Sequence, residues 1–278
     1  MTGLSSNLEA DVTVLSYRIS GEEHQLKQHT STGAKKGHIK AVLKHDSEEN
    51  HSQVYSELVA NRLAQFLGLP VAVGVAISDT DNQSITRFAS LWVEDITANV
   101  FDFTSEVPPQ YQPPEPNKNN GIHRDFYWQY KRLCTLHPIE AAQLAVFDLW
   151  VGNEDRELNL KGRVDGEVGG NELNVFFALD QGDSLLSCGS SKEDSLKKLQ
   201  SPSFPDFSPM SSFLNPFECG LMTERIKSIP DWALMSAVVC GVQVGSVTPD
   251  MQYMLLDILD KRREVLCELV ERVLLTPA

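Results

Sequence analysis

The pattern of apolar residues changes partway along this sequence, from short alternating runs to long runs at helical spacing. Before about residue 93 the runs are short and separated by turn residues, as in residues 39–44, where apolar and polar side chains largely alternate. From about Phe126 onward the spacing is mainly helical, and the last such run covers residues 249–275. A strand-rich part followed by a mostly helical part predicts an α+β fold with a small first lobe and a larger second lobe.

The first lobe, assigned to residues 1–93, is expected to be a small sheet with one helix. Apolar residues between Val54 and Leu67 follow helical spacing, and Gly68 stands where a helix C-cap is expected. Strand-like runs precede and follow this helix. They cover residues 12–19, 39–44, 70–77 and 84–93, with a polar linker at 30–37 between the first two and a turn at 79–82 between the last two.

The second lobe, assigned to residues 94–278, is expected to be mainly helical. Helical spacing covers residues 127–136, 139–151 and 249–275, and one strand-like run at residues 174–179 interrupts the helices. Residues 106–121 differ from both kinds of element, because they contain five prolines and three asparagines. This composition predicts an irregular and mobile surface segment.

The charge of the chain argues against whole classes of partner. Among 278 residues, 38 are acidic and 24 are Lys or Arg, which gives a formal net charge of −14. An acidic surface repels nucleic acids and anionic lipid headgroups, so we expect no direct binding to nucleic acid or membrane. No apolar run is long enough to span a bilayer, and the first residues lack the basic and apolar regions of a secretory signal. These features predict a globular, cytoplasmic protein.

Three polar residues of the second lobe have the chemistry and spacing of a phosphate-transfer site. Asp155 and Asn159 stand four residues apart in the polar loop that follows the helical run ending at Val151, and Asp180 follows the strand-like run. Phosphoryl transfer from ATP requires carboxylate and amide ligands for Mg²⁺ and a carboxylate that orients the accepting hydroxyl. A loop after a helix, followed by a strand, can bring these groups together.

The same chemistry needs a cation on the phosphates, and Lys44 at the end of a strand-like run can supply it. Glu57 lies at the start of the following helical run, where strand and helix can pack so that the two residues form an ion pair. Two alternatives remain open. Lys40 lies on the same face of the strand as Lys44, and Glu57 could instead be an exposed carboxylate that interacts with the helix dipole.

These segments together resemble the HipA-like kinases and, more distantly, the phosphatidylinositol kinases. The second lobe contains FDLWVGNEDRELN at 147–159 and FALDQG at 177–182, which are similar to the catalytic segments of these families. The first lobe contains AVLK at 41–44 and ELVANRLAQFLGLP at 57–70, which are similar to the strand with the phosphate-binding lysine and to the following helix. Weaker similarities are IPDW at 229–232 and LDKRR at 259–263. The resemblance implies a bilobal protein kinase-like fold.

The resemblance also implies a role for each matching residue. Asp155 would be the catalytic carboxylate, and Asn159 and Asp180 would bind Mg²⁺. Lys44, paired with Glu57, would contact the ATP phosphates. The backbone of the adenine-binding hinge would be formed by Ser90, Leu91, Trp92 and Val93.

Two features depart from the family pattern. Many relatives have His where Glu157 stands, and their interval from the catalytic Asp to the metal-binding Asn is often five residues, whereas here it is four. Asn159 is therefore the position that separates an active kinase from a silent one. Arg156 is expected to structure the loop by pairing with an acidic neighbour. Several serines in residues 187–203 lie where kinases have their activation segment.

The sequence therefore predicts an ATP- and Mg²⁺-dependent phosphotransferase of the HipA-like type that acts on a Ser or Thr hydroxyl of a protein. A protein substrate is favoured over a lipid, because no basic membrane-binding surface is evident. The resemblance also implies an antitoxin or another regulatory protein as a partner. The alternatives are a catalytically silent pseudokinase that binds nucleotide or protein, and a nucleotidyl transferase on the same fold.

Overall fold

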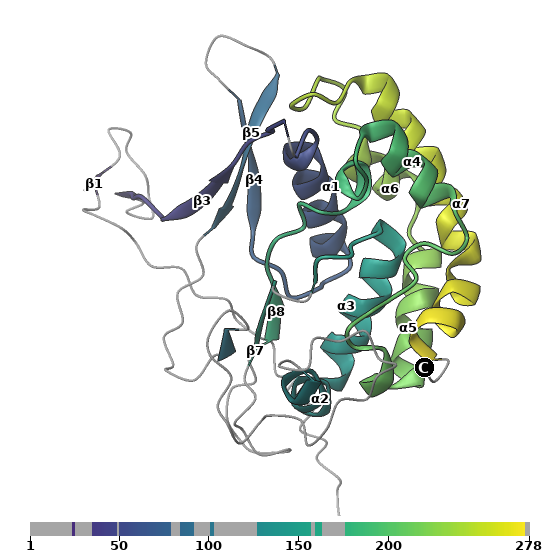
Figure 1. Cartoon of the computed structure of the whole chain (residues 1–278). Helices are drawn as coiled ribbons and strands as arrows, with labels where there is room; N and C mark the ends of the chain where they lie inside the picture. The colour runs from purple at the N-terminus through teal and green to yellow at the C-terminus, as the bar shows by residue number, and fades with distance from the viewer. Residues whose placement is uncertain are drawn as a thin grey trace, which may run out of the picture.

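The computed structural model of the chain describes residues 24–25, 35–48, 50–78, 84–91, 101–102, 127–156, 159–162 and 176–275. Figure 1 shows a small antiparallel sheet on one side of helix α1 (Gln53–Phe66) and a larger group of helices on the other side. Strands therefore come first and helices later, as the sequence predicts. Within the described ranges, no helix is both long enough and apolar enough to cross a membrane.

The first sheet has three antiparallel strands in the spatial order β3 (Ala41–Lys44), β5 (Ile85–Leu91) and β4 (Gly74–Ser78). Lys44 lies directly opposite Phe88, so both side chains leave the sheet on the same face. Phe88 is buried in the main hydrophobic core together with residues of α1. The sheet thus directs Lys44 toward α1.

Helix α1 is held at both ends. At its N-terminus, the N-cap residue Ser52 makes no side-chain hydrogen bond, and Asp46 Oδ1 instead accepts one from the Val54 amide at 2.9 Å. Beyond its C-terminus, Gly68 has a φ of 68°, in the left-handed region that favours glycine. From the first turn of the helix, the Tyr55 hydroxyl donates to the Val238 carbonyl oxygen at 3.0 Å. These contacts fix α1 between the sheet and the helical part of the chain.

The helical part is built around α3, whose inward residues are fully buried. The Trp150 indole in α3 donates to the Leu259 carbonyl oxygen at 3.1 Å, and Arg262 donates to the Trp150 carbonyl oxygen at 2.9 Å, so α3 is tied to α7. The elements of this part are α2 (Tyr127–Leu136), α3 (Pro138–Val151), η3 (Leu185–Ser187), α4 (Lys192–Gln200), η4 (Ser211–Phe213), α5 (Pro216–Lys227), α6 (Asp231–Val238), α7 (Pro249–Val270) and its π-helical continuation η5 (Glu271–Leu275).

A second small sheet carries the chain from α3 toward Asp180. Its strands lie in the order β6 (Phe101–Asp102), β7 (Leu160–Gly162) and β8 (Phe176–Ala178). Ala178 also donates from its amide to the Pro70 carbonyl oxygen at 2.8 Å and forms a parallel bridge with Val71. The segment before Asp180 is therefore anchored to the segment that follows α1.

Most predicted elements are present with small shifts in their ends. The three long predicted helices correspond to α2, α3 and α7. The predicted strand at 174–179 contains β8, and its first two residues lie outside the described residues. The strand predicted at 70–77 begins four residues later, because Pro70 and Val71 bond to Ala178 instead of to the first sheet.

One sequence expectation is wrong in part. The linker predicted at 30–37 includes the short strand β2 (Lys35–Lys36), which pairs with β1 (His24–Gln25) because its backbone groups find partners there. The strand predicted at 12–19, the turn predicted at 79–82 and the segment predicted to be irregular at 106–121 lie outside the described residues.

Candidate active site

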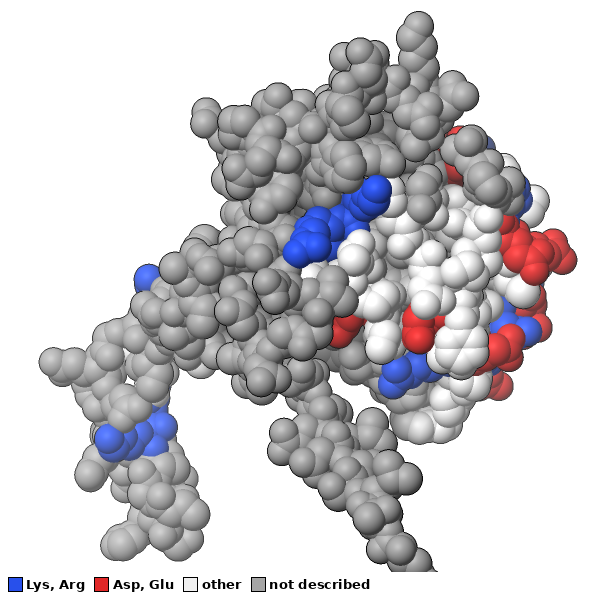
Figure 2. Space-filling model, turned by 90° about the horizontal axis from the view of Figure 1, so that it is seen from below, with Lys and Arg blue, Asp and Glu red and all other residues white. Residues whose placement is uncertain are grey.

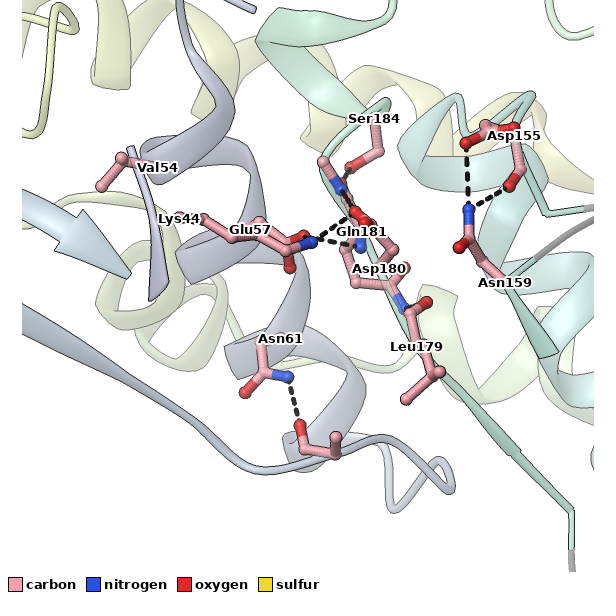
Figure 3. Close-up of polar contacts among 12 residues, drawn as sticks. Lys44, Val54, Glu57, Asn61, Asp155, Asn159, Leu179, Asp180, Gln181 and Ser184 are labelled. Carbon is pink, nitrogen blue, oxygen red and sulfur yellow. Dashed lines mark hydrogen bonds and ion pairs between the residues drawn. The ribbon is translucent and has the colours of Figure 1, made fainter. Parts of the chain in front are cut away.

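Lys44, Glu57 and Asp180 form one connected group where β3, α1 and the segment after β8 meet (Figure 3). The Lys44 ammonium forms an ion pair with Glu57, and its Nζ lies 2.6 Å from Asp180 Oδ1. The Glu57 side chain is buried, with 3% of its surface exposed, whereas 38% of the Asp180 side chain is exposed. The reading of Glu57 as an exposed carboxylate is therefore excluded, and Lys44, rather than the exposed Lys40, makes the contact.

The electrostatics of this group follow from its burial. Burial raises the pKa of Glu57 to about 8, although the nearby Lys44 ammonium acts in the opposite direction. Burial also acts to raise the pKa of Asp180, but its hydrogen bond with Glu57 and the charge of Lys44 outweigh that effect and lower it to about 2. Asp180 therefore stays ionised over the physiological range, as a cation ligand must.

A tight turn after β8 presents the Asp180 carboxylate. Asp180 has a φ of 36°, in the left-handed region, and its Oδ1 accepts a hydrogen bond from the Gly182 amide at 3.0 Å. Between these two residues, the Gln181 amide donates to Glu57 Oε1 at 3.0 Å. A Cβ at Gly182 would lie 3.0 Å from both Asp180 Oδ1 and Gln53 Nε2, so glycine allows the close approach.

The loop after α3 holds Asp155 and Asn159 against each other. The loop begins at Gly152, which has a φ of 73°, and the Asp155 amide donates to Asn153 Oδ1 at 3.0 Å. The Asn159 side-chain amide donates to the Asp155 carbonyl oxygen at 2.8 Å and to Asp155 Oδ2 at 2.9 Å. Figure 3 shows the amide nitrogen of Asn159 turned toward Asp155. With a four-residue interval, the two side chains thus meet directly.

Backbone contacts place this loop beside Asp180. The Leu179 amide donates to the Asn159 carbonyl oxygen at 2.9 Å, just beyond the pairing of Leu160 with Ala178 in the second sheet. Asp155, Asn159 and Asp180 are therefore brought to one region by neighbouring strands, as the sequence predicts. Asp155 is exposed and Asn159 is half-buried, so both can be reached from solvent.

The side chains present fit a magnesium ion. Asp155, Asn159 and Asp180 offer carboxylate and amide oxygens, the hard donors that Mg²⁺ prefers. A further carboxyl group, Asp183, lies close by: burial and the negative charges of Asp155 and Asp180 raise its pKa. Such a concentration of negative charge favours a divalent cation. Among the described residues, no three His, Cys, Asp or Glu side chains form a group that could hold a metal ion, so the oxygen of Asn159 would be needed as a ligand.

The predicted hinge lies only partly within the described residues. Ser90 and Leu91 are the last residues of β5, where Ser90 lies opposite Val42 and Gly74 and the Leu91 amide donates to the Val73 carbonyl oxygen at 2.8 Å. Trp92 and Val93 lie outside the described residues. The adenine-binding role of these four residues stays a prediction.

Two residues beside the site were not identified from the sequence as participants. Asp148 is buried in α3 and forms an ion pair with Arg156, and Gln181 accepts a hydrogen bond from the same guanidinium group. The expectation that Arg156 pairs with an acidic neighbour is thereby confirmed. A signal for Asp148 was present, because it is the one charged residue in the apolar run 141–151.

The fold that carries this site is a protein kinase-like fold, which confirms the predicted fold class. The proinflammatory kinase CtkA of Helicobacter pylori matches the structure with a TM-score of 0.55 and 16% sequence identity, over 88% of this chain and 94% of that chain. Because the identity is low, this match establishes the fold and not the activity.

Two further solved structures match with lower TM-scores. The HipA, HipB and operator DNA complex of Shewanella oneidensis MR-1 gives a TM-score of 0.37 and 14% identity, over 94% of this chain and 59% of that chain. The Golgi casein kinase with Mn/ADP bound gives 0.39 and 14%, over 94% of this chain and 74% of that chain. No family model and no curated protein matches the sequence.

Proposed function

We propose that this protein is an ATP- and Mg²⁺-dependent phosphotransferase. The observation that supports the proposal most strongly is the contact of Lys44 with both Glu57 and Asp180. A lysine on a strand paired with a glutamate on the next helix, beside a metal-binding aspartate, is the arrangement that places a cation on the phosphates of ATP.

Each residue then has a defined part in the reaction. Lys44 binds phosphate oxygens and is oriented by Glu57. Asp155 accepts a hydrogen bond from the substrate hydroxyl and takes up its proton as the hydroxyl oxygen attacks the γ-phosphorus. The bond between the γ-phosphorus and the oxygen that bridges it to the β-phosphate breaks in the same transfer, and ADP leaves. Asp180 and Asn159 would hold Mg²⁺, which supplies positive charge against the phosphate oxygens when bound.

The finer assignment rests on sequence motifs. The order AVLK, ELVANRLAQFLGLP, NEDRELN and LDQG supports a HipA-like kinase that phosphorylates a Ser or Thr hydroxyl of a protein. The backbone from Ser90 to Val93 would bind the adenine. Residues 1–93 would form the nucleotide-binding lobe and residues 94–278 the catalytic lobe. An antitoxin or another regulatory protein as partner follows from the sequence resemblance alone.

A catalytically silent pseudokinase is the second candidate, and one contact favours it. The Asn159 amide donates a hydrogen bond to the Asp155 carboxylate, so the two side chains partly satisfy each other. A role in catalysis requires that Asp155 exchange this hydrogen bond for one from the substrate.

The two candidates differ in the fate of ATP. Purified protein is incubated with Mg²⁺ and either γ-labelled or α-labelled ATP, alongside Asp155→Ala and Asp180→Ala. Transfer of the γ label that is lost in both variants supports the kinase. Transfer of the α label points to nucleotidyl transfer, and ATP binding in calorimetry without transfer points to the pseudokinase.

A further inference from the structure

The side chain of Arg156 is one of the largest fully buried side chains among the described residues, with only 1% of the residue exposed. On one side, Nε and Nη2 donate to the two carboxylate oxygens of Asp148 in α3, each at 2.9 Å. On the other side, Nη2 donates to Gln181 Oε1 and Nη1 donates to the Leu179 carbonyl oxygen, each at 2.7 Å. Arg156 therefore joins α3 to the residues on both sides of Asp180.

The same guanidinium group also reaches the loop that carries Asn159. Nη1 lies 3.3 Å from the Asn159 carbonyl oxygen and 3.4 Å from the Asp180 carbonyl oxygen. Arg156 itself directly follows Asp155 in the sequence. A guanidinium group holds its N–H donors in one rigid plane, so its partners are fixed relative to one another. One side chain thus sets the distance between the backbones of Asn159 and Asp180.

The burial of this group makes a purely stabilising role a weak explanation. The Arg156 and Asp148 side chains are 2% and 7% exposed. Removing two charges from water is costly, and apolar residues of similar volume are often equally stable at such positions. An apolar pair cannot donate hydrogen bonds, so it cannot link the carbonyl oxygens of Leu179, Asn159 and Asp180, which all lie within 3.4 Å of Arg156 Nη1.

We infer that Arg156, oriented by Asp148 and bonded to Gln181, is a positioning residue that keeps Asn159 and Asp180 at the separation required to bind one divalent cation. This inference rests on the proposed function, because it assumes that Asn159 and Asp180 are metal ligands. It goes further, because it predicts that substitutions of Arg156 and Gln181, which do not touch the metal, weaken metal binding. In other proteins, mutation of residues that orient metal ligands without touching the metal lowers metal affinity by about 10- to 100-fold.

The test uses two variants of the full chain that change the contacts in different ways. Gln181→Met removes the side-chain hydrogen bond to Arg156 without leaving a buried charge unpaired, and it keeps the Gln181 backbone contact with Glu57. Arg156→Lys keeps the charge beside Asp148 but cannot form the planar set of hydrogen bonds. If Arg156→Lys does not fold, Gln181→Met alone decides.

Arg262→Lys is the matched control. Arg262 is another buried arginine, 5% exposed, and it donates to the carbonyl oxygens of Leu149, Trp150, Leu199 and Phe204. None of these contacts involves the segments that carry Asn159 or Asp180. Its substitution reports the general cost of losing a buried guanidinium group.

The primary measurement is Mn²⁺ binding in the presence of ADP, followed by electron paramagnetic resonance, with the Mg²⁺ concentration for half-maximal phosphate transfer as a second measurement. We expect the Mn²⁺ dissociation constant to rise at least about 10-fold in both test variants. We expect Arg262→Lys to lower the melting temperature and to leave Mn²⁺ binding within about two-fold of the wild type. Affinity within about two-fold of the wild type in Gln181→Met, or an equal loss in Arg262→Lys, overturns the inference.

These outcomes separate the inference from the function on which it rests. If the wild type binds Mn²⁺ but transfers no phosphate, the proposed function fails and the binding comparison still decides the role of Arg156. If the wild type transfers phosphate and the test variants bind metal normally, only the inference fails. If the wild type binds no Mn²⁺, both fail.

Discussion

Lys44 Nζ lies 2.6 Å from Asp180 Oδ1, which joins the end of β3 to the turn after β8. The two residues are far apart in the sequence, and Glu57 of α1 completes the group by pairing with the same ammonium. The Lys44 ammonium group thus connects the first sheet, α1 and the turn that follows β8. The site and the packing of the two parts of the chain therefore depend on the same contacts.

Replacing Lys44 tests whether both the site and the packing of the two parts of the chain depend on this residue. Lys44→Met removes the cation that faces both the ionised Asp180 carboxylate and the buried Glu57 carboxyl, and loss of a hydrogen bond to a charged group costs about 1.5–3 kcal/mol. We expect urea unfolding to show a loss of that size, together with loss of phosphate transfer. Lys40→Met is the control, because Lys40 is an exposed residue just before the same strand, and we expect its effect to stay within about 0.5 kcal/mol. Equal effects of the two substitutions would contradict the assignment of Lys44.

The raised pKa of Glu57 gives stability a definite dependence on pH. The folded protein holds the Glu57 proton up to about pH 8, whereas the unfolded chain releases it near pH 4.5, the ordinary pKa of a glutamate. Between these values Glu57 binds a proton in the folded state but not in the unfolded state, so its contribution to stability is fully present below about pH 4.5 and is lost as the pH rises to about 8.

We therefore expect the free energy of unfolding of the wild type, relative to Glu57→Gln, to fall between pH 5 and about pH 8, with a slope of up to about 1.4 kcal/mol per pH unit. Gln keeps the shape and can still accept the hydrogen bond from Gln181, but it cannot titrate. Urea unfolding of both proteins across this range measures the difference. A difference that does not change with pH shows that burial of Glu57 does not raise its pKa.

The loop that carries Asp155 depends on the backbone of Gly152. Gly152 has a φ of 73°, and a Cβ there would lie 2.7 Å from Leu199 Cδ2 and 2.9 Å from Phe204 Cε1. Gly152→Ala is expected to cost about 2 kcal/mol or more, since the left-handed conformation alone costs about 1 kcal/mol. Gly220→Ala in α5 is the matched control. A Cβ at Gly220 meets nothing within 4 Å, so we expect a gain of about 0.5 kcal/mol in thermal unfolding, and the same sign for both substitutions would contradict this account.

The serines after Asp180 differ in their surroundings. Ser195 is fully buried in α4, where its hydroxyl donates to the Leu186 carbonyl oxygen and accepts from the Gly189 amide, both at 2.9 Å. Ser195→Ala is expected to cost about 1–2 kcal/mol, because it leaves these buried groups without their partner. Ser203 is exposed, and Ser203→Ala should change stability by less than about 0.5 kcal/mol. Chemical denaturation of both variants measures this difference, which would be absent if the Ser195 contacts contributed nothing.

The parts of this fold that follow from local pattern could be predicted from the sequence. The helical spacing of residues 54–67 and the glycine at position 68 located α1, since its buried face and its C-cap are local features. The order Lys44, Glu57, Asp155, Asn159, Asp180 could be recognised because each residue lies at or near one end of a periodic run and matches a motif of the HipA-like kinases.

Contacts between distant segments could not be predicted in this way. The burial of Glu57 depends on the turn after β8, whose Gln181 amide donates to it. The partners of Arg156 come from α3 and from the residues around Asp180, so no local pattern indicates that they meet. The same reason explains β4: whether Pro70 and Val71 join the first sheet or bond to Ala178 is decided by tertiary packing.

The most direct test of the central claim is the transfer of label from γ-labelled ATP in the presence of Mg²⁺. We expect the wild type to transfer the label to a protein hydroxyl, and Asp155→Asn, which keeps the shape of the side chain but cannot accept the proton, to be at least about 100-fold slower. Circular dichroism confirms that the variant is folded. A wild-type rate equal to that of Asp155→Asn would contradict the assignment of this protein as a phosphotransferase that uses Asp155.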